Sequence, residues 1–474
     1  MIVSVSALLI AACGGPAPTS APAVGPATTN LPRPEPSPAI ATFNPAATIG
    51  QPTLVPPPLP PGVVSSSAPS VPPATPAPTS PLPGTTALVL PTDAGVTTIA
   101  LGPIPPGSAP GQYPPKSGGT PTGPYVYLGA DPVNQSAYRL SVVDLSGGSV
   151  RYVPLPSRPA ESVAYALVTG GRLVVLLRRQ EGWPPEQLGM PCSSSNGRPI
   201  TWRLLVARLG SDGLPAQGWW QVDAGVATRP FTDPNAGVTC HDPLVPPVTV
   251  AGDAGSLVAY ATDHPSAAYS AGSRIVLRSL ASGTVERVID TATTVTALAL
   301  SATSVAWVES PDADAPGPVT RWRVMRAPVG TGVASEVPLA VPGRIWRYAP
   351  QNIMLDGDAV LTNPGARVIG WGIAVRSQGS SVVALNPSGS PYCTVFGASL
   401  GVAVLACRSE GTDDHVATWS ATHGLRVLAE PGPALYRSET VASGYVAWVW
   451  ADLMTLTRQD LVAVPFGGLI AANR

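Results

Sequence analysis

A glycine-flanked serine is the first candidate for chemistry in this sequence. Residues Gly397-Ala398-Ser399-Leu400-Gly401 match G-x-S-x-G, a pattern in which the serine attacks a carbonyl group from a sharp turn between a strand and a helix. The segments on both sides, PYCTVF and VAVLAC, are strand-like. Because two strands supply neither the helix nor the oxyanion hole, we interpret Ser399 as part of a β-turn and predict no catalytic residue.

Histidines and acidic residues in polar segments are candidate ligands or general acids and bases. They are His241, His264, Asp312, Asp314, Asp413, Asp414 and His415. Such side chains bind Zn²⁺ when they converge in space, but the acidic segments lack the spacing and glycine of an EF-hand. We therefore predict no metal and no cofactor, with a histidine metal triad as the alternative.

Tryptophan is frequent, with eleven residues, and its position separates core from surface. Trp307, Trp322, Trp419 and Trp448 lie inside apolar, strand-like segments, which favours packing in the core. Trp183 lies instead in the polar segment EGWPPEQ. We therefore expect only Trp183 among these five to be available for ligand contact.

Composition divides the chain into two parts. Residues 14–123 contain about half of the 59 prolines, and their charged residues are Arg33, Glu35, Asp93 and Lys116. So little apolar area cannot offset the entropy of ordering, which predicts a disordered tether over 13–85 and a folded domain over 86–474. The net charge is -1 and Lys116 is the single lysine, so we expect no nucleic-acid partner.

The N-terminus carries a short apolar run that ends in Ile10-Ala11-Ala12-Cys13. These residues resemble the lipobox of bacterial lipoprotein signal peptides, although a basic segment before the apolar run is missing. The resemblance implies that residues 1–12 are removed, that Cys13 is acylated and that the protein is anchored to the outside of the cell membrane. An ordinary secretory signal with a chance cysteine is the alternative, and it also predicts export.

A short strand-like sequence motif of three residues recurs seven times in the folded part. It starts at Val126, Val174, Val258, Val305, Ala359, Val402 and Val446, and has the form Val-Ala-Trp or a close variant. Five of the six intervals lie near the length of a four-stranded propeller blade, and the long one contains insertions at 181–199 and 226–247. Within 293–340 the segments VTALALS, SVAWVES, TRWRVMRAPV and ASEVPLA read as four successive strands.

The repeat predicts an all-β fold: a β-propeller of about seven four-stranded blades, mainly over 124–474, with six or eight blades or a pair of β-sandwiches as alternatives. TALVLP and VTTIALG, within 86–101, are expected to be closing strands. The blades resemble those of TolB-type and YWTD-like bacterial surface propellers. This resemblance concerns the architecture, and it carries over no catalytic residue.

Four cysteines follow Cys13, and the blade pattern pairs them. Cys393 and Cys407 flank the hairpin centred on Leu400, so we predict that they face each other and form a disulfide. Cys192 and Cys240 lie in two long insertions of one propeller face, which predicts a second disulfide. Unpaired thiols are the alternative.

The long connections place most candidate residues on one face of the propeller. These are Trp183, His241, His264, Asp312, Asp314, Asp413, Asp414 and His415. Because binding residues concentrate on loops held by a rigid scaffold, we predict a monomeric binding or scaffold module for an unknown protein or glycan ligand. The alternative is an enzyme that acts on cell-wall or environmental glycans, with loop carboxylates as acid and base.

Overall fold

The described part of the chain consists of β-strands and one short C-terminal helix. The computed structural model describes residues 86–88, 90, 95–102, 125–129, 140–158, 161–180, 200–227, 231–233, 238–240, 249–252, 255–263, 272–310, 321–340, 349–350, 352–364, 373–386, 392–408, 415–428, 440–442, 445–451 and 459–473. All of them belong to the larger of two compact units, Phe43–Arg474.

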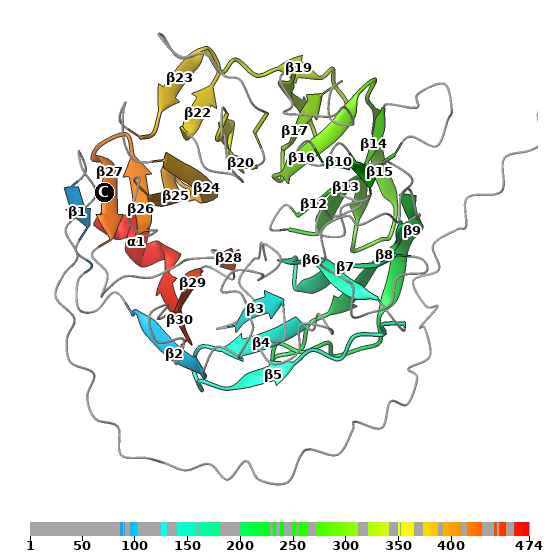
Figure 1. Ribbon diagram of the computed structural model, residues 1–474, viewed down its shortest axis with the longest axis horizontal. Helices are drawn as coiled ribbons and strands as arrows, with labels where there is room; N and C mark the ends of the chain where they lie inside the picture. The colour runs from blue at the N-terminus through cyan, green and yellow to red at the C-terminus, as the bar shows by residue number, and fades with distance from the viewer. Residues whose placement is uncertain are drawn as a thin grey trace, which may run out of the picture. The chain divides into compact units, whose positions relative to one another are not determined.

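Seven sheets follow one another around a ring (Figure 1). We number these blades along the chain and label their strands A to D from the inside outward. Blade 1 has β3 (Tyr125–Gly129), β4 (Leu140–Asp144) and β5 (Val150–Tyr152), which we label B, C and D because a tight turn joins β4 to β5 beside the C-to-D turn of blade 2. Blade 2 has β6 (Ser162–Thr169), β7 (Arg172–Gln180), β8 (Ile200–Arg208) and β9 (Trp220–Ala227). Blade 3 has β12 (Thr249–Gly252), β13 (Leu257–Asp263), β14 (Ser273–Ser279) and β15 (Val285–Asp290).

The remaining blades repeat this antiparallel order. Blade 4 has β16 (Thr294–Leu300), β17 (Ser304–Ser310), β18 (Arg323–Pro328) and β19 (Ser335–Glu336). Blade 5 has β20 (Ile353–Asp356), β21 (Ala359–Thr362), β22 (Val375–Gln378) and β23 (Ser381–Ala384). Blade 6 has β24 (Tyr392–Ser399), β25 (Val402–Arg408), β26 (His415–Ser420) and β27 (Gly424–Leu428). A separate hairpin, β10 (Phe231–Asp233) with β11 (Val238–Cys240), lies in the second predicted insertion.

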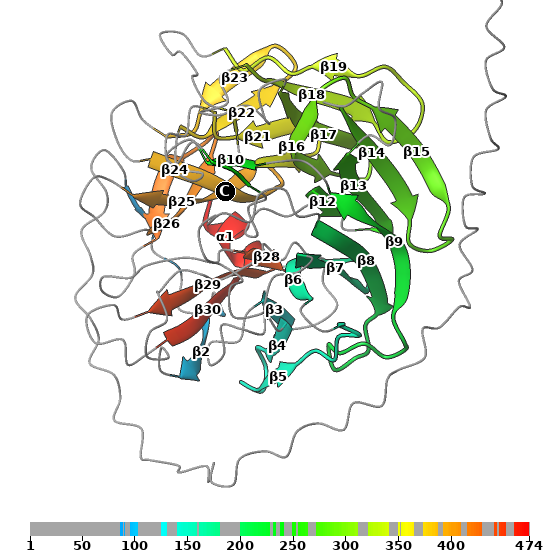
Figure 2. The same ribbon diagram turned by 45° about the vertical axis from the view of Figure 1, so that its right-hand side comes forward.

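Strands from both ends of the folded part close the ring, as the turned view in Figure 2 shows. Blade 7 combines β28 (Thr440–Ala442), β29 (Tyr445–Ala451) and β30 (Gln459–Pro465) with β2 (Thr97–Gly102), which supplies the outer strand. The prediction of a closing strand is therefore confirmed for β2. The other segment, β1 (Thr86–Leu88), pairs in parallel with β27 and becomes a fifth strand of blade 6.

A separate hydrophobic core fills each of the seven spaces between neighbouring blades. The core between blades 7 and 1 contains Ile99 of β2 together with Val126 and Leu461, so it joins the first and last strands of the ring. The core between blades 6 and 7 also contains Leu469 of helix α1 (Phe466–Ala472). Burial of apolar area across all seven spaces stabilises the closed ring.

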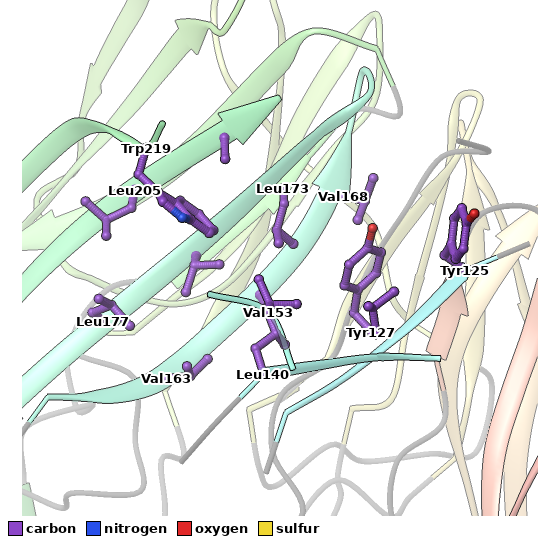
Figure 3. Close-up of a cluster of buried hydrophobic side chains, with 14 residues drawn as sticks. Tyr125, Tyr127, Leu140, Val153, Val163, Val168, Leu173, Leu177, Leu205 and Trp219 are labelled. Carbon is purple, nitrogen blue, oxygen red and sulfur yellow. The ribbon is translucent and has the colours of Figure 1, made fainter. Parts of the chain in front are cut away.

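The core between blades 1 and 2 includes aromatic residues whose polar ends are also satisfied (Figure 3). The Tyr127 hydroxyl donates to the Gly213 carbonyl at 2.7 Å, and Trp219 Nε1 donates to the Pro154 carbonyl at 2.8 Å. Burial raises the pKa of Tyr127 well above its usual range. These bonds cross from one blade to the other, so they fix the blades side by side in addition to apolar packing.

The repeated motif occupies strand B in blades 2 to 7. Its first and third side chains point toward the preceding blade in some copies and toward the following blade in others. In blades 3, 4 and 7 the aromatic third residue, Tyr260, Trp307 or Trp448, packs against the preceding blade. In blades 2, 5 and 6 the third residue, Leu176, Leu361 or Val404, packs against the following blade. A shift of one residue along a strand reverses the faces of its side chains. The copies therefore occupy equivalent strands, but their register within the strand differs by one residue.

Candidate ligand-binding face

The two ends of the ring differ in their connections. We call the end with the B-to-C and D-to-A connections the loop face, and the end with the A-to-B and C-to-D connections the turn face. The turn-face connections are tight: Gly170-Gly171 joins β6 to β7, and Leu400-Gly401 joins β24 to β25. All four residues have positive φ, as two-residue hairpin turns with matching strand twist require.

The Leu400-Gly401 turn settles the geometry of the serine motif. Ser399 is the last residue of β24 and pairs with Val402, the first residue of β25. The motif is therefore a strand, a turn and a strand, as predicted from the flanking residues. Such a hairpin provides no helix N-terminus next to the serine, so the nucleophile elbow is not formed.

Buried charged and histidine side chains gather at the loop face. Among the described residues they are Arg178, Arg203, Glu309, His415 and Asp460. Each lies in the part of its strand that is nearer the loop face. Burial of a charge is costly unless hydrogen bonds and opposite charges compensate for it, so these side chains need polar partners. We call the five side chains and their hydrogen-bond partners the polar layer of the loop face.

In blade 4 this layer is centred on Glu309 of β17, which has partners on β17 and β18. Glu309 is 3% exposed and accepts a hydrogen bond from Trp307 Nε1 at 2.9 Å. Arg323 lies opposite Glu309 in the strand register and donates Nε to its carboxylate at 2.5 Å. The next residue, Ser310, donates its hydroxyl to the Arg321 carbonyl. These contacts fix both strand ends that flank residues 311–320.

In blade 2 a buried ion pair holds the connection that leads in from blade 1. Arg203 of β8 donates Nε to Glu161 at 2.8 Å and Nη2 to the other carboxylate oxygen at 2.5 Å. It also donates to the Pro156 carbonyl at 3.0 Å, and the Arg158 amide donates to Glu161 at 2.6 Å. This bidentate arrangement is the strongest geometry for such a pair, and it fixes a D-to-A connection.

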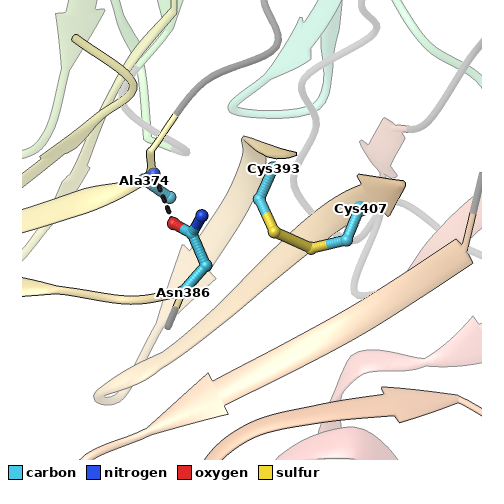
Figure 4. The surroundings of a disulfide bond; sticks show 4 residues. All are labelled: Ala374, Asn386, Cys393 and Cys407. Atoms are coloured by element: carbon cyan, nitrogen blue, oxygen red, sulfur yellow. Dashed lines mark hydrogen bonds between the residues drawn. A yellow bond between two sulfur atoms is a disulfide. The ribbon is translucent and has the colours of Figure 1, made fainter. Parts of the chain in front are cut away.

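Blades 3 and 5 hold their loop-face ends with uncharged groups. In blade 3, Thr291 Oγ1 accepts from the Ser273 amide at 3.1 Å, and Ser273 Oγ accepts from the Val295 amide at 3.0 Å. In blade 5, Asn386 Oδ1 accepts from the Ala374 amide at 2.7 Å (Figure 4). Buried side chains thus bond the backbone where strands start and end, which rigidifies the bases of the loops.

Most of the predicted face residues lie outside the described part of the chain. These are Trp183, His241, His264, Asp312, Asp314, Asp413 and Asp414. His415 is described, and its placement in a loop was wrong: it is the first residue of β26, lies opposite Cys407 and is 6% exposed. All six residues of HVATWS are buried, so the strand is covered on both faces as far as the histidine.

The predicted pairing of Cys393 with Cys407 is confirmed. The two residues are cross-strand neighbours in blade 6, with Cα atoms 4.1 Å apart, and a disulfide joins them (Figure 4). Such bonds persist in oxidising compartments, so this one fits an exported protein. Cys13 and Cys192 lie outside the described residues, and Cys240 ends β11 opposite Phe231.

Two further properties concern only the described residues. None of their helices is long and apolar enough to cross a membrane. Within the same residues, no group of three or more His, Cys, Asp or Glu side chains is arranged to hold a metal ion.

The sequence contained a signal for the buried charges that the search for loop residues missed. Arg203 interrupts the apolar run in TWRLLV, and Glu309 directly follows the apolar run of VAWVES. A charged residue at an inward position of a strand needs a partner, and each of these finds one in a neighbouring strand or connection.

Several solved propellers resemble this fold at low sequence identity. The propeller domain of the trilobed protease from Pyrococcus furiosus is 11% identical, with a TM-score of 0.45 over 75% of this chain and 94% of that one. A prolyl endopeptidase is 13% identical, with a TM-score of 0.47 over 75% of this chain and 47% of that one. TolB from Acinetobacter baumannii is 14% identical, with a TM-score of 0.32 over 72% and 80%.

The chain spans about half the length of that prolyl endopeptidase. No protein-family model matches the sequence, and no curated protein matches it either. At these TM-scores and identities the likenesses carry no information on activity. The architecture of a seven-bladed β-propeller therefore stands on the sheet order and the seven inter-blade cores of this chain.

Proposed function

We propose that this protein is an exported lipoprotein whose propeller binds a partner through its loop face. The lipid would be attached to Cys13, and residues 13–85 would tether the propeller to the membrane. The lipobox-like end Ile10-Ala11-Ala12-Cys13 and the proline-rich composition support this part of the proposal. The Cys393–Cys407 disulfide agrees with export.

The single observation that carries the binding role is the polar layer at the loop face. The five buried charged or histidine residues of the described chain lie there, as does Glu161, whose side chain is 5% exposed. The ion pairs of blades 2 and 4 hold the ends of the strands from which the long connections depart. Connections that are fixed at their bases lose less entropy when they bind, so this face is the better suited of the two for a partner.

The partner class follows from location and charge. A net charge of -1 gives no basis for binding a polyanion, and an exported protein meets envelope proteins and glycans. We therefore propose an envelope protein or glycan as the ligand and a non-catalytic binding role. Trp183 and the polar residues of the long connections would supply the contacts.

Selective blocking of the two faces tests this proposal. Ala292 is an exposed residue between β15 and β16 at the loop face, and Val333 is an exposed residue of the C-to-D turn in blade 4 at the turn face. A large polyethylene glycol maleimide would be attached to Ala292→Cys or Val333→Cys, and co-sedimentation with lipid-free cell-envelope material would be measured. We expect loss of binding with the first adduct alone. Equal binding by both adducts, or loss with the second alone, would overturn the proposal.

A further inference from the structure

The direction of β1 shows which end of this strand lies nearer each face of the ring. In blade 6, β26 ends at Ser420 and β27 begins at Gly424, so their connection lies at the turn face. Strand β1 runs parallel to β27, with Thr86 opposite Arg426 and Leu88 opposite Leu428. Leu88 is therefore nearer the loop face, and Thr86 is nearer the turn face.

The C-terminal end of the described chain lies beside the same turn. Arg426 donates Nη1 to the Ala472 carbonyl at 2.8 Å, and the Ser420 hydroxyl donates to the Asn473 carbonyl at 3.4 Å. Both ends of the folded part thus meet at the turn-face side of blade 6.

A pair of arginines lies at the turn-face end of blade 2. Arg172 is the first residue of β7 and Arg208 the last residue of β8, and the two are directly opposite in the register. Like charges in this position destabilise a sheet unless an anion compensates for them. Arg172 is half-buried and donates Nη1 only to the Gly170 carbonyl at 3.1 Å, and Arg208 is exposed. Neither forms an ion pair with any described residue.

Three other turn-face arginines differ, because each bonds an acceptor of the neighbouring blade. Arg151 reaches Asp212, Arg326 reaches Asp358, and Arg287 donates to the Gly330 and Gly332 carbonyls at 2.6 Å. Burial, and then the nearby Arg208, lower the pKa of Arg172. Arg172 and Arg208 therefore form a directly opposed pair of positive charges, and neither has an acidic partner among the described residues.

We propose that the turn face lies against the membrane and that Arg172 and Arg208 contact the phosphate groups of anionic phospholipids. The inference rests on the proposed membrane tether. In a ring of seven blades, blade 2 lies nearly opposite blade 6, where the tether arrives. The tether would keep the propeller near the bilayer, and the arginine pair would direct the turn face toward it, which leaves the loop face directed outward.

The free energy of two arginine contacts with the membrane is sufficient to orient a domain that is already tethered. Each arginine near an anionic membrane surface contributes roughly 1 kcal/mol, which is about a fivefold preference. Guanidinium groups also match phosphate oxygens in geometry. Because the tether already holds the domain near the bilayer, the pair needs only to select an orientation and not to supply the whole affinity.

Orientation can be measured without the natural lipid. The full chain from residue 13 onward, with Cys13→Ser and a histidine tag in place of residues 1–12, would be bound to vesicles that contain a nickel-chelating lipid. The vesicles would consist of phosphatidylcholine with or without phosphatidylglycerol. The rate of labelling by a large polyethylene glycol maleimide would be measured for Val333→Cys at the turn face and Ala292→Cys at the loop face. The parent chain without either cysteine corrects for the native ones.

We expect phosphatidylglycerol to slow labelling at Val333→Cys roughly fivefold or more and to leave Ala292→Cys unchanged. The double variant Arg172→Gln/Arg208→Gln should lose this protection, Arg172→Lys/Arg208→Lys should retain most of it, and Arg274→Gln/Arg408→Gln at the loop face should retain all of it. Equal labelling at the two faces, or protection that survives Arg172→Gln/Arg208→Gln, would overturn the inference. Because the tag replaces the lipid, the result is independent of whether Cys13 is acylated.

Discussion

Arg203 and Glu161 form a bidentate ion pair in which the two side chains are only 8% and 5% exposed. The pair joins strand C of blade 2 to the connection from blade 1, at the bases of the loops that we propose to bind a partner. The ion pair therefore both stabilises the fold and fixes the bases of these loops.

Removal of one partner of this pair should strongly destabilise the propeller. Glu161→Gln leaves the guanidinium of Arg203 buried without its counter-charge, at an expected cost of about 3 to 5 kcal/mol. The exposed pair Arg274–Asp290, at 35% and 45% exposure, is the matched control, and Asp290→Asn should cost less than about 1 kcal/mol. Urea denaturation of both variants measures the difference. Similar losses in the two variants would show that Arg203–Glu161 is not the buried clamp described above.

The disulfide of blade 6 should contribute measurably to stability. It closes a loop of 14 residues in sequence, for which the entropy model gives about 3 kcal/mol. We expect Cys393→Ala/Cys407→Ala to unfold at correspondingly lower urea concentration. Non-reducing peptide mapping should show Cys393 joined to Cys407, and we also predict Cys192 joined to Cys240. A peptide that links Cys192 to Cys393 or Cys407 would contradict the blade assignment.

The fifth strand of blade 6 should contribute to the fold through one side chain. Leu88 of β1 is completely buried in the core between blades 6 and 7. We expect Leu88→Ala to cost about 2 to 4 kcal/mol, because the substitution leaves a cavity between two blades. Val96, which is 51% exposed, serves as the control, and Val96→Ala should change the free energy of unfolding very little. Unaltered stability of Leu88→Ala would mean that β1 is not docked on blade 6.

A partly buried tyrosine should make the propeller sensitive to alkali. Burial raises the pKa of Tyr165, on the inner strand of blade 2, to about 12, whereas an exposed tyrosine titrates near 10. The folded chain therefore keeps this proton longer than the unfolded chain. The stabilisation is complete below about pH 10 and is lost as the pH rises toward about 12.

Tyr165→Phe should flatten this pH dependence. The measurement is the free energy of unfolding at several values between about pH 9 and 11. Tyr152 is 52% exposed, so Tyr152→Phe provides a control that should keep the slope of the parent chain. An unchanged slope in Tyr165→Phe would exclude this residue as a source of the alkaline effect.

The blade order could be predicted from the sequence because strand length and spacing depend on local residues. The four strands expected within 293–340 correspond to β16, β17, β18 and β19. The facing of the strands could not be predicted in the same way. Val305-Ala306-Trp307 and Val402-Ala403-Val404 look alike, yet their first residues pack against opposite neighbours, because the phase of the alternation depends on the turn before each strand.

Strand pairing between residues far apart in the sequence could not be predicted either. The three residues of β1 carry no local signal that they join β27 in parallel. The buried position of His415 depends likewise on its partner Cys407 across the ladder. Arg203 and Glu309 did have a visible signal, since the first interrupts an apolar run and the second directly follows one, but their partners are set by the packing of separate strands and connections.

The central claim, a propeller tethered by a lipid on Cys13, is tested most directly by limited proteolysis of the membrane fraction. We expect cleavage within residues 13–85 to release a resistant fragment, which begins near residue 86, into the supernatant, while the N-terminal peptide with Cys13 stays in the pellet. Full-length Cys13→Ser should lose the partitioning into a detergent phase that the acylated parent chain shows. A Cys13 peptide that leaves the pellet together with the propeller fragment, or Cys13→Ser that partitions into detergent like the parent chain, would contradict the account.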